Sequence, residues 1–141
     1  MSYVVDASVA VKWYLDEPLR DQANQLLQET GQLHAPELLV SEVANASWKR
    51  CMRGDIAQLQ AWEITASILD SVLQFHPVSG LIKDALGIAL TLNHPVYDCL
   101  YIACAGQTGS VLITADARLC DAVTDTPFAS RVQHLADFAG Q

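Results

Sequence analysis

Short apolar runs alternate along this chain with longer segments in which hydrophobic residues recur at helical spacing. This alternation is typical of an α/β fold in which helices cover a mainly parallel sheet. The apolar runs predict short strands at Tyr3–Val5, Leu33–Ala35, Gln74–Val78, Val111–Thr114 and Arg131–Gln133. We therefore expect a short-stranded, mainly parallel central sheet.

The segments between these runs predict the helices. Their ranges are Ser8–Leu15, Leu19–Glu29, Pro36–Met52, Asp55–Leu73, Gly80–Leu92, Asp98–Gln107 and Ala117–Ala122, with a short turn near Ala136. Pro36 suits the first turn of a helix, Gly54 suits a helix end, and Pro95 separates two helices. No repeat, low-complexity tract or linker is present, so we expect residues 1–141 to form a single domain.

Composition and charge indicate where the protein is located and which class of partner its charge disfavours. No signal peptide is recognisable, and no apolar run approaches the roughly 20 residues that span a membrane. The four cysteines form no C-x-x-C pair, which indicates reduced thiols and a cytoplasmic protein. The 16 acidic and 8 basic residues give a net charge of −8, which opposes non-specific attraction to a nucleic acid. A nucleic-acid substrate would need cations or local basic patches to offset this repulsion.

Three aspartates stand where an apolar or β-prone run gives way to a helix. Asp6 and Asp116 follow predicted strands, and Asp98 follows a short connector. Because the carboxyl ends of parallel strands open onto one edge of the sheet, Asp6 and Asp116 are candidates for a ligand site there. Taken singly, each aspartate is better explained as a helix N-cap, so the case for a site depends on the set.

Capping cannot explain Glu42, which lies inside a predicted helix between Leu39 and Ala46 on a largely apolar face. Asp98 repeats this pattern, because Tyr101 and Ile102 continue its face of the next helix. Two carboxylates about 4 Å apart repel by about 4 kcal/mol at an effective dielectric of about 20. An all-oxygen set of ligands suits a hard divalent cation such as Mg²⁺ or Mn²⁺, and no histidine or cysteine cluster suggests zinc.

Four segments, in order and with helices between them, resemble the PIN-domain family and, among its members, the VapC-type toxins. They read Val-Val-Asp6-Ala-Ser8, Leu-Leu-Val-Ser-Glu42-Val-Ala-Asn45, Tyr97-Asp98-Cys-Leu-Tyr-Ile-Ala and Thr114-Ala-Asp116-Ala-Arg-Leu. The resemblance runs from Ser2 to about Leu119. It implies a three-layer α/β/α fold and a Mg²⁺- or Mn²⁺-dependent endoribonuclease, a toxin that is often dimeric and inhibited by a cognate antitoxin.

The same resemblance implies roles for particular residues. The acids at Asp6, Glu42, Asp98 and Asp116 would surround the metal, and the hydroxyl of Thr114 would help to order the site. The net charge of −8 also makes a basic inhibitory segment on the antitoxin plausible, since Arg or Lys can compete with a metal for an acidic pocket.

Other polar residues near these acids have two possible roles each. Ser8 and Asn45 can hold a metal ligand or a water, or else make local backbone hydrogen bonds. Lys12, Lys49 and Arg53 can guide a phosphate backbone, or else be ordinary solvated side chains.

Trp13, Tyr14, Trp48 and Trp62 can stack on bases, anchor a protein partner or pack in the core, and the Trp13-Tyr14 pair is the preferred interface. The four histidines are scattered, and we assign them to structure or surface.

Two rival classes of function are a catalytically silent PIN-like module and a different α/β protein with an acidic pocket, either an aspartyl phosphatase or a phosphotransfer receiver. A catalytically silent PIN-like module would keep the acids for metal-dependent stability or for docking a basic partner. An aspartyl phosphatase needs an Asp-x-Asp start, and a phosphotransfer receiver needs a second acid beside Asp6 and a late lysine after a strand. Neither of the latter patterns is present.

Overall fold

Five parallel strands form one sheet, in the order β3-β2-β1-β4-β5, within residues 1–28 and 31–138, which the computed structural model describes. The strands are β1 (Tyr3–Val5), β2 (Leu33–Pro36), β3 (Gln74–His76), β4 (Val111–Thr114) and β5 (Val132–His134). Strand β1 is central: Val4 is in register with His34 of β2 on one side and with Leu112 of β4 on the other. The predicted parallel sheet of short strands is confirmed.

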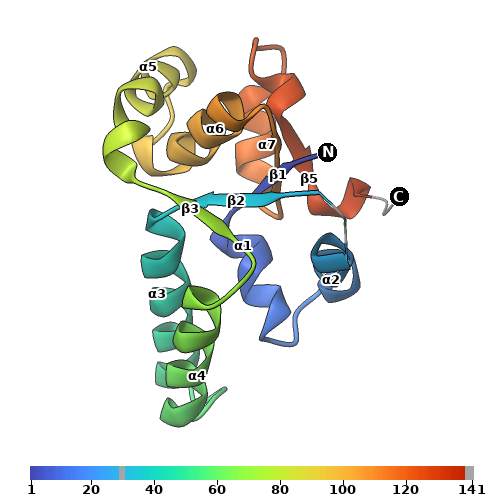
Figure 1. Ribbon diagram of the computed structural model, residues 1–141, viewed down its shortest axis with the longest axis vertical. Helices are drawn as coiled ribbons and strands as arrows, with labels where there is room; N and C mark the ends of the chain where they lie inside the picture. The colour runs from blue at the N-terminus through green and yellow to red at the C-terminus, as the bar shows by residue number, and fades with distance from the viewer. Residues whose placement is uncertain (29–30, 139–141) are drawn as a thin grey trace.

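Helices cover both faces of this sheet (Figure 1). One layer contains α1 (Ala7–Ala10), α2 (Arg20–Gln28), α3 (Leu38–Met52) and α4 (Gln58–Leu69), and the other contains α5 (Ile82–Leu92), α6 (Val96–Thr108) and α7 (Ala117–Val123). Helices α3 and α4 pack side by side as a hairpin that projects away from the sheet. This is the expected three-layer α/β/α arrangement. No helix among the described residues is long and apolar enough to cross a membrane.

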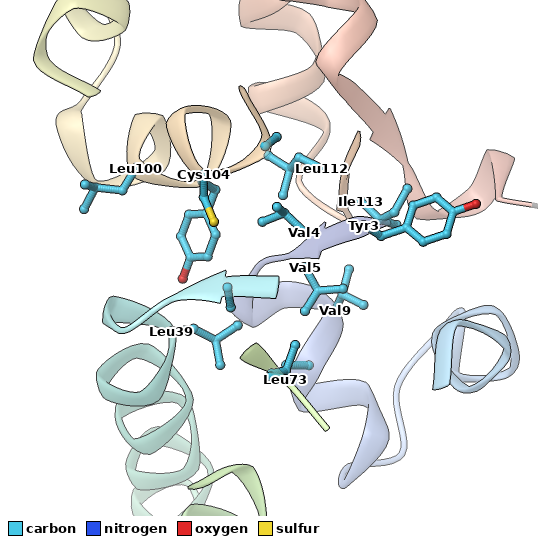
Figure 2. Close-up of a cluster of buried hydrophobic side chains, with 14 of the residues drawn as sticks. Tyr3, Val4, Val5, Val9, Leu39, Leu73, Leu100, Cys104, Leu112 and Ile113 are labelled. Atoms are coloured by element: carbon cyan, nitrogen blue, oxygen red, sulfur yellow. The ribbon is translucent and has the colours of Figure 1, made fainter. Parts of the chain in front are cut away.

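The central strand explains why its sequence is an unbroken apolar run. Val4 and Val5 point to opposite faces of the sheet, and both are fully buried. Figure 2 shows Val4 on the side of Leu100 and Cys104 in α6, with Val5 beside Val9 of α1. A strand that is covered on both faces has no solvent side, so polar residues are excluded until the chain leaves the sheet at Asp6.

The predicted helix Pro36–Met52 begins too early. Pro36 closes β2, where it is in register with His76, and helix α3 starts at Leu38. The pairing of β2 with β1 ends at His34, so the missing N–H of Pro36 costs no bond on that side. The predicted first helix, Ser8–Leu15, is also wrong in part, because α1 ends at Ala10 and a 3₁₀ turn, Val11–Trp13, follows it.

Local chain features explain the other large differences. The predicted strand Gln74–Val78 ends at His76, because Pro77 begins a 3₁₀ turn. The predicted helix Asp55–Leu73 shrinks to α4, since Gly54 has a positive φ of 80° and the chain turns there before the helix. Helix α6 begins at Val96, before the predicted start at Asp98, so Asp98 lies within its first turn.

The remaining boundaries differ by one or two residues. Helix α5 starts at Ile82 where Gly80 was predicted, α7 ends at Val123 where Ala122 was predicted, and β5 is shifted one residue from Arg131–Gln133. The turn near Ala136 is confirmed as a 3₁₀ turn. Helix α2 begins one residue after Leu19, and the predicted end of that helix at Glu29 lies outside the described residues.

Candidate active site

Asp6 lies where β1 ends and α1 begins, and it is only 7% exposed. Its Oδ1 atom accepts hydrogen bonds from the Val9 N–H at 3.2 Å and from the Ser8 hydroxyl at 2.5 Å. Its Oδ2 atom accepts a hydrogen bond from the hydroxyl of Thr114, at the end of the neighbouring strand β4. Asp6 therefore caps α1, as its interpretation as an N-cap predicted. Thr114, at the end of a second strand, also fixes it in place.

Burial is the dominant influence on this carboxyl group. It raises the pKa of Asp6 to about 6, although the three hydrogen bonds lower it, and the nearby charge of Glu42 raises it further. The buried surroundings of Asp6 thus disfavour its negatively charged form. A cation beside it would relieve that cost.

Glu42 projects from α3 toward α6, where the buried hydroxyl of Tyr101 donates a hydrogen bond to its Oε1 atom. Burial raises the pKa of Glu42, the Tyr101 hydrogen bond lowers it, and the negative charge of Asp98 raises it. Burial also raises the pKa of Tyr101 strongly, with Glu42, Asp6 and Asp98 adding to the effect. Tyr101 therefore stays a neutral donor, and the three acids act on one another from β1, α3 and α6.

Asp98 has a partner of its own, because His94 Nε2 lies 2.7 Å from its Oδ2 atom. His94 precedes Pro95, the N-cap of α6, so the ring reaches over the first turn of that helix. The pKa of the adjacent Cys99 thiol is raised to about 11 by burial and by the charge of Asp98. The histidine therefore fixes one oxygen of Asp98, whereas burial and the Asp98 charge keep the cysteine protonated.

Asp116 is connected to Asp6 through Thr114. The Asp116 N–H donates to the Thr114 hydroxyl oxygen at 3.0 Å, and that same hydroxyl donates to Asp6. The Asp116 carboxylate also caps α7 by accepting the Arg118 N–H at 2.9 Å. Asp116 is therefore both the N-cap of α7 and a neighbour of Asp6.

A cavity of about 360 Å³ opens beside Glu42. Ser8, Asn45 and Lys49 line it together with Glu42, so the structure brings these predicted residues to one place. Lys12 is buried, and its ammonium lies 3.1 Å from Glu17. The Arg53 guanidinium lies 3.5 Å from Asp55. These last two cations are therefore engaged by acids outside the cluster, unlike Lys49.

The donor set fits a hard divalent cation. The acids offer only oxygen, although among the described residues no three Asp, Glu, His or Cys side chains lie together as a group that could hold a metal ion. Mg²⁺ usually keeps several waters and is held by one or two carboxylates together with substrate phosphate. An open acidic cluster therefore suits such an ion better than it suits a structural metal, which would be caged.

Sequence analysis missed two residues of the site and misplaced one aromatic side chain. The spacing of four between His94 and Asp98 was available as a signal, whereas nothing local pairs Tyr101 with Glu42. Trp13 is 8% exposed, and its indole N–H donates to the Ala23 carbonyl at 2.8 Å. The preferred Trp13-Tyr14 interface is therefore wrong, since Trp13 belongs to the core.

Comparison with known proteins identifies the family. The PIN domain model matches residues 3–124. Ribonuclease VapC3 of Pyrobaculum aerophilum is 32% identical over 123 residues, which cover 86% of this chain and 94% of that protein.

Two solved structures share the fold. A crystal structure from Pyrobaculum aerophilum gives a TM-score of 0.70 at 23% identity, covering 96% of this chain and 85% of that one. A toxin-antitoxin complex from Klebsiella pneumoniae gives a TM-score of 0.68 at 15% identity, covering 94% of this chain and 97% of that one. With its acids at the ends of β1 and β4 and on α3 and α6, the chain belongs to the PIN-domain family.

Proposed function

We propose that this chain is a divalent-metal-dependent endoribonuclease and the toxin of a toxin-antitoxin pair. The observation that carries the proposal is the buried Asp6 carboxylate, held by Thr114 and raised in pKa beside Glu42 in a PIN domain. The relative named ribonuclease VapC3 supports RNA as the substrate. We further propose that residues 1–141 act as one domain.

In this proposal Asp6, Glu42, Asp98 and Asp116 hold Mg²⁺ or Mn²⁺. A bound divalent cation lowers the pKa of water and neutralises charge on a scissile phosphate, which is the chemistry that phosphodiester hydrolysis needs. No protein nucleophile is required.

The surrounding residues keep these carboxylates in place. Thr114 and Ser8 fix the two oxygens of Asp6, Tyr101 fixes one oxygen of Glu42, and His94 fixes one oxygen of Asp98. Such outer partners orient ligands and commonly affect metal affinity 10- to 100-fold. Asn45 and Lys49 line the cavity beside Glu42, where an amide can hold a water and an ammonium can contact phosphate.

The direct test is a cleavage assay in Mn²⁺ against a panel of RNAs that includes tRNA, with single-stranded DNA in parallel. Asp6→Asn and Asp98→Asn should abolish cleavage while leaving the protein folded. Asp70→Asn is the matched control, because Asp70 is an exposed acid at the end of α4. Equal cleavage by all variants would refute the mechanism, and stabilisation by Mg²⁺ without any cleavage would identify a silent binding module.

We propose a cognate antitoxin with a basic inhibitory segment as the protein partner. The acidic cluster and the net charge of −8 favour an Arg or Lys side chain entering the site. The toxin-antitoxin complex from Klebsiella pneumoniae, which shares this fold, supports a partner of this class. A pull-down from the native host tests the proposal, and a partner that still inhibits after its basic segment is neutralised would contradict it.

We also propose a homodimer. Ile82, Leu86 and Leu90 lie four residues apart on α5 and are 40%, 50% and 75% exposed, so they form an apolar row on the surface. Light scattering should give the mass of a dimer, and Leu90→Glu should shift it toward the monomer. A wild-type protein that is monomeric at all concentrations would exclude the dimer.

A further inference from the structure

Two tryptophans line a groove between α3 and α4. Trp48 is 56% exposed and Trp62 is 74% exposed, and both border an open groove of about 380 Å³. Ala44, Ala61 and Thr65 are among the other lining residues, so small side chains separate the two indoles.

Leaving two indoles in water is unfavourable, because burying apolar surface stabilises a protein. The hairpin projects from the sheet (Figure 1), and neither tryptophan is among the described residues that pack on the main core. Exposed aromatic groups gathered in one groove are typical of a binding surface.

The end of α3 that carries Trp48 also carries three basic residues, although none of them lines the groove. Lys49, Arg50 and Arg53, from the last turns of α3 and its C-cap, are three of the chain's 8 basic residues. Arg50 and Arg53 contact Asp55, and Arg50 also contacts Glu17. No ion pair holds Lys49 within residues 1–28 and 31–138. Exposed aromatic rings next to basic side chains are the combination that binds single-stranded nucleic acids.

Helix α3 connects the groove with the acidic cluster. Lys49 follows Trp48 in sequence, and it lines the cavity that contains Glu42 and Asn45. Glu42 and Lys49, seven residues apart, share one face of α3, and the Trp48 indole lies on the neighbouring face. A strand held at the acids would reach the indoles by passing Lys49.

We propose that the α3–α4 groove binds single-stranded RNA, with bases stacked on Trp48 and Trp62 and a phosphate on Lys49. This assignment rests on the proposed ribonuclease function, since it extends the substrate path from the acidic cluster onto the hairpin. The Lys49 ammonium, which no ion pair holds among the described residues, favours a phosphate over the basic segment expected of an inhibitory partner.

Binding is tested separately from cleavage. The probe is a single-stranded RNA oligonucleotide in EDTA, which withholds the divalent cation that the proposed cleavage needs, and its Kd is measured by the quenching of tryptophan fluorescence and by anisotropy. Trp48→Ala and Trp62→Ala should each raise Kd by about five-fold or more, whereas the Phe variants at both positions should stay close to wild type, because a phenyl ring still stacks. Leu59→Ala is the matched control, since Leu59 is 68% exposed on α4 but does not line the groove.

Cleavage of a natural RNA is measured in parallel. The two Ala variants should raise KM and leave kcat within about two-fold, because the indoles lie outside the acidic cluster. Thermal melting checks that all variants fold, as expected for exposed positions.

The outcomes separate the two proposals. Wild type that binds RNA through the tryptophans without cleaving it would refute only the ribonuclease function. Wild type that cleaves RNA, with Ala variants that bind it normally, would refute only the stacking surface. Ala variants that lose a purified protein partner but keep RNA would assign the groove to that partner and overturn the inference.

Discussion

The hydroxyl of Tyr101 donates a hydrogen bond to the carboxylate of Glu42, which joins α6 to α3 across 59 positions of sequence. The donor is neutral, so it orients Glu42 without cancelling its charge. The hydrogen bond favours the charged form of Glu42, and the helix that supplies Asp98 also positions Glu42.

Replacing Tyr101 with Phe removes this hydrogen bond and little else. We expect the free energy of unfolding to fall by about 1–3 kcal/mol, as for the loss of a hydrogen bond to a charged group. We also expect weaker Mn²⁺ binding, because the pKa of Glu42 loses a contribution that lowers it. Urea denaturation and calorimetric titration measure the two effects. Tyr97→Phe is the control on the same helix, since Tyr97 is 67% exposed, and an equal loss of stability there would contradict the prediction.

The stability of the metal-free protein should depend on Asp6 between about pH 4 and pH 6. Its pKa rises from 3.8 to about 6 on folding, so the folded state binds a proton in this interval that the unfolded state releases. The free energy of unfolding therefore falls as the pH rises through the interval, by up to about 3 kcal/mol. Urea denaturation in EDTA should show that Asp6→Asn removes most of this slope and that Asp70→Asn keeps it. Identical slopes in wild type and Asp6→Asn would show that Asp6 titrates normally.

Divalent cations should stabilise the fold, because they relieve repulsion among acids that burial has brought together. At 100 times its Kd, Mn²⁺ should add about 2.7 kcal/mol to the free energy of unfolding. Thermal melting with and without Mn²⁺ should show this shift in Asp70→Asn and a much smaller one in Asp98→Asn. A shift of full size in Asp98→Asn would place the ion elsewhere.

His94 should affect metal binding without touching the metal. Its Nε2 atom lies 2.7 Å from Asp98, so His94→Ala frees that carboxylate to rotate. We expect the Kd for Mn²⁺ to rise about 10-fold, and His94→Gln to recover part of the loss because its amide can still donate. Calorimetric titration distinguishes weaker Mn²⁺ binding from a change in stability alone. An unchanged Kd in His94→Ala would show that the contact with Asp98 is only structural.

The sequence predicted the layers of this fold well because its strands are buried on both faces. Runs such as Tyr3–Val5 carry no polar residue, so they stand out between amphipathic helices. The boundary at Pro36 was misjudged, because proline suits both a helix start and the end of a strand whose neighbour has already stopped. Whether Pro36 starts a helix or ends a strand depends on the length of β1, and Pro36 itself does not indicate that length.

The site was predictable to the extent that its residues break a local pattern. Glu42 and Asp98 interrupt apolar faces, and they do lie in one electrostatic cluster with Asp6. Tyr101 is a hydrophobic residue on a buried face, so nothing in its neighbourhood marks its hydroxyl as the partner of Glu42. Trp13 and Trp62 look alike in sequence, but one packs beside α2 and the other borders a groove.

The position of β1 between β2 and β4 has a consequence for the order in which the chain is made. The chain is synthesised in the N- to C-terminal direction, so Asp6 is made 108 positions before the Thr114 hydroxyl that holds its Oδ2 atom. A nascent chain that stops before β4 leaves one edge of β1 without its hydrogen-bonding neighbour and lacks Thr114 and Asp116 altogether. We therefore expect products that terminate before β4 to be inert, so that the proposed activity appears only after Asp116 has been made.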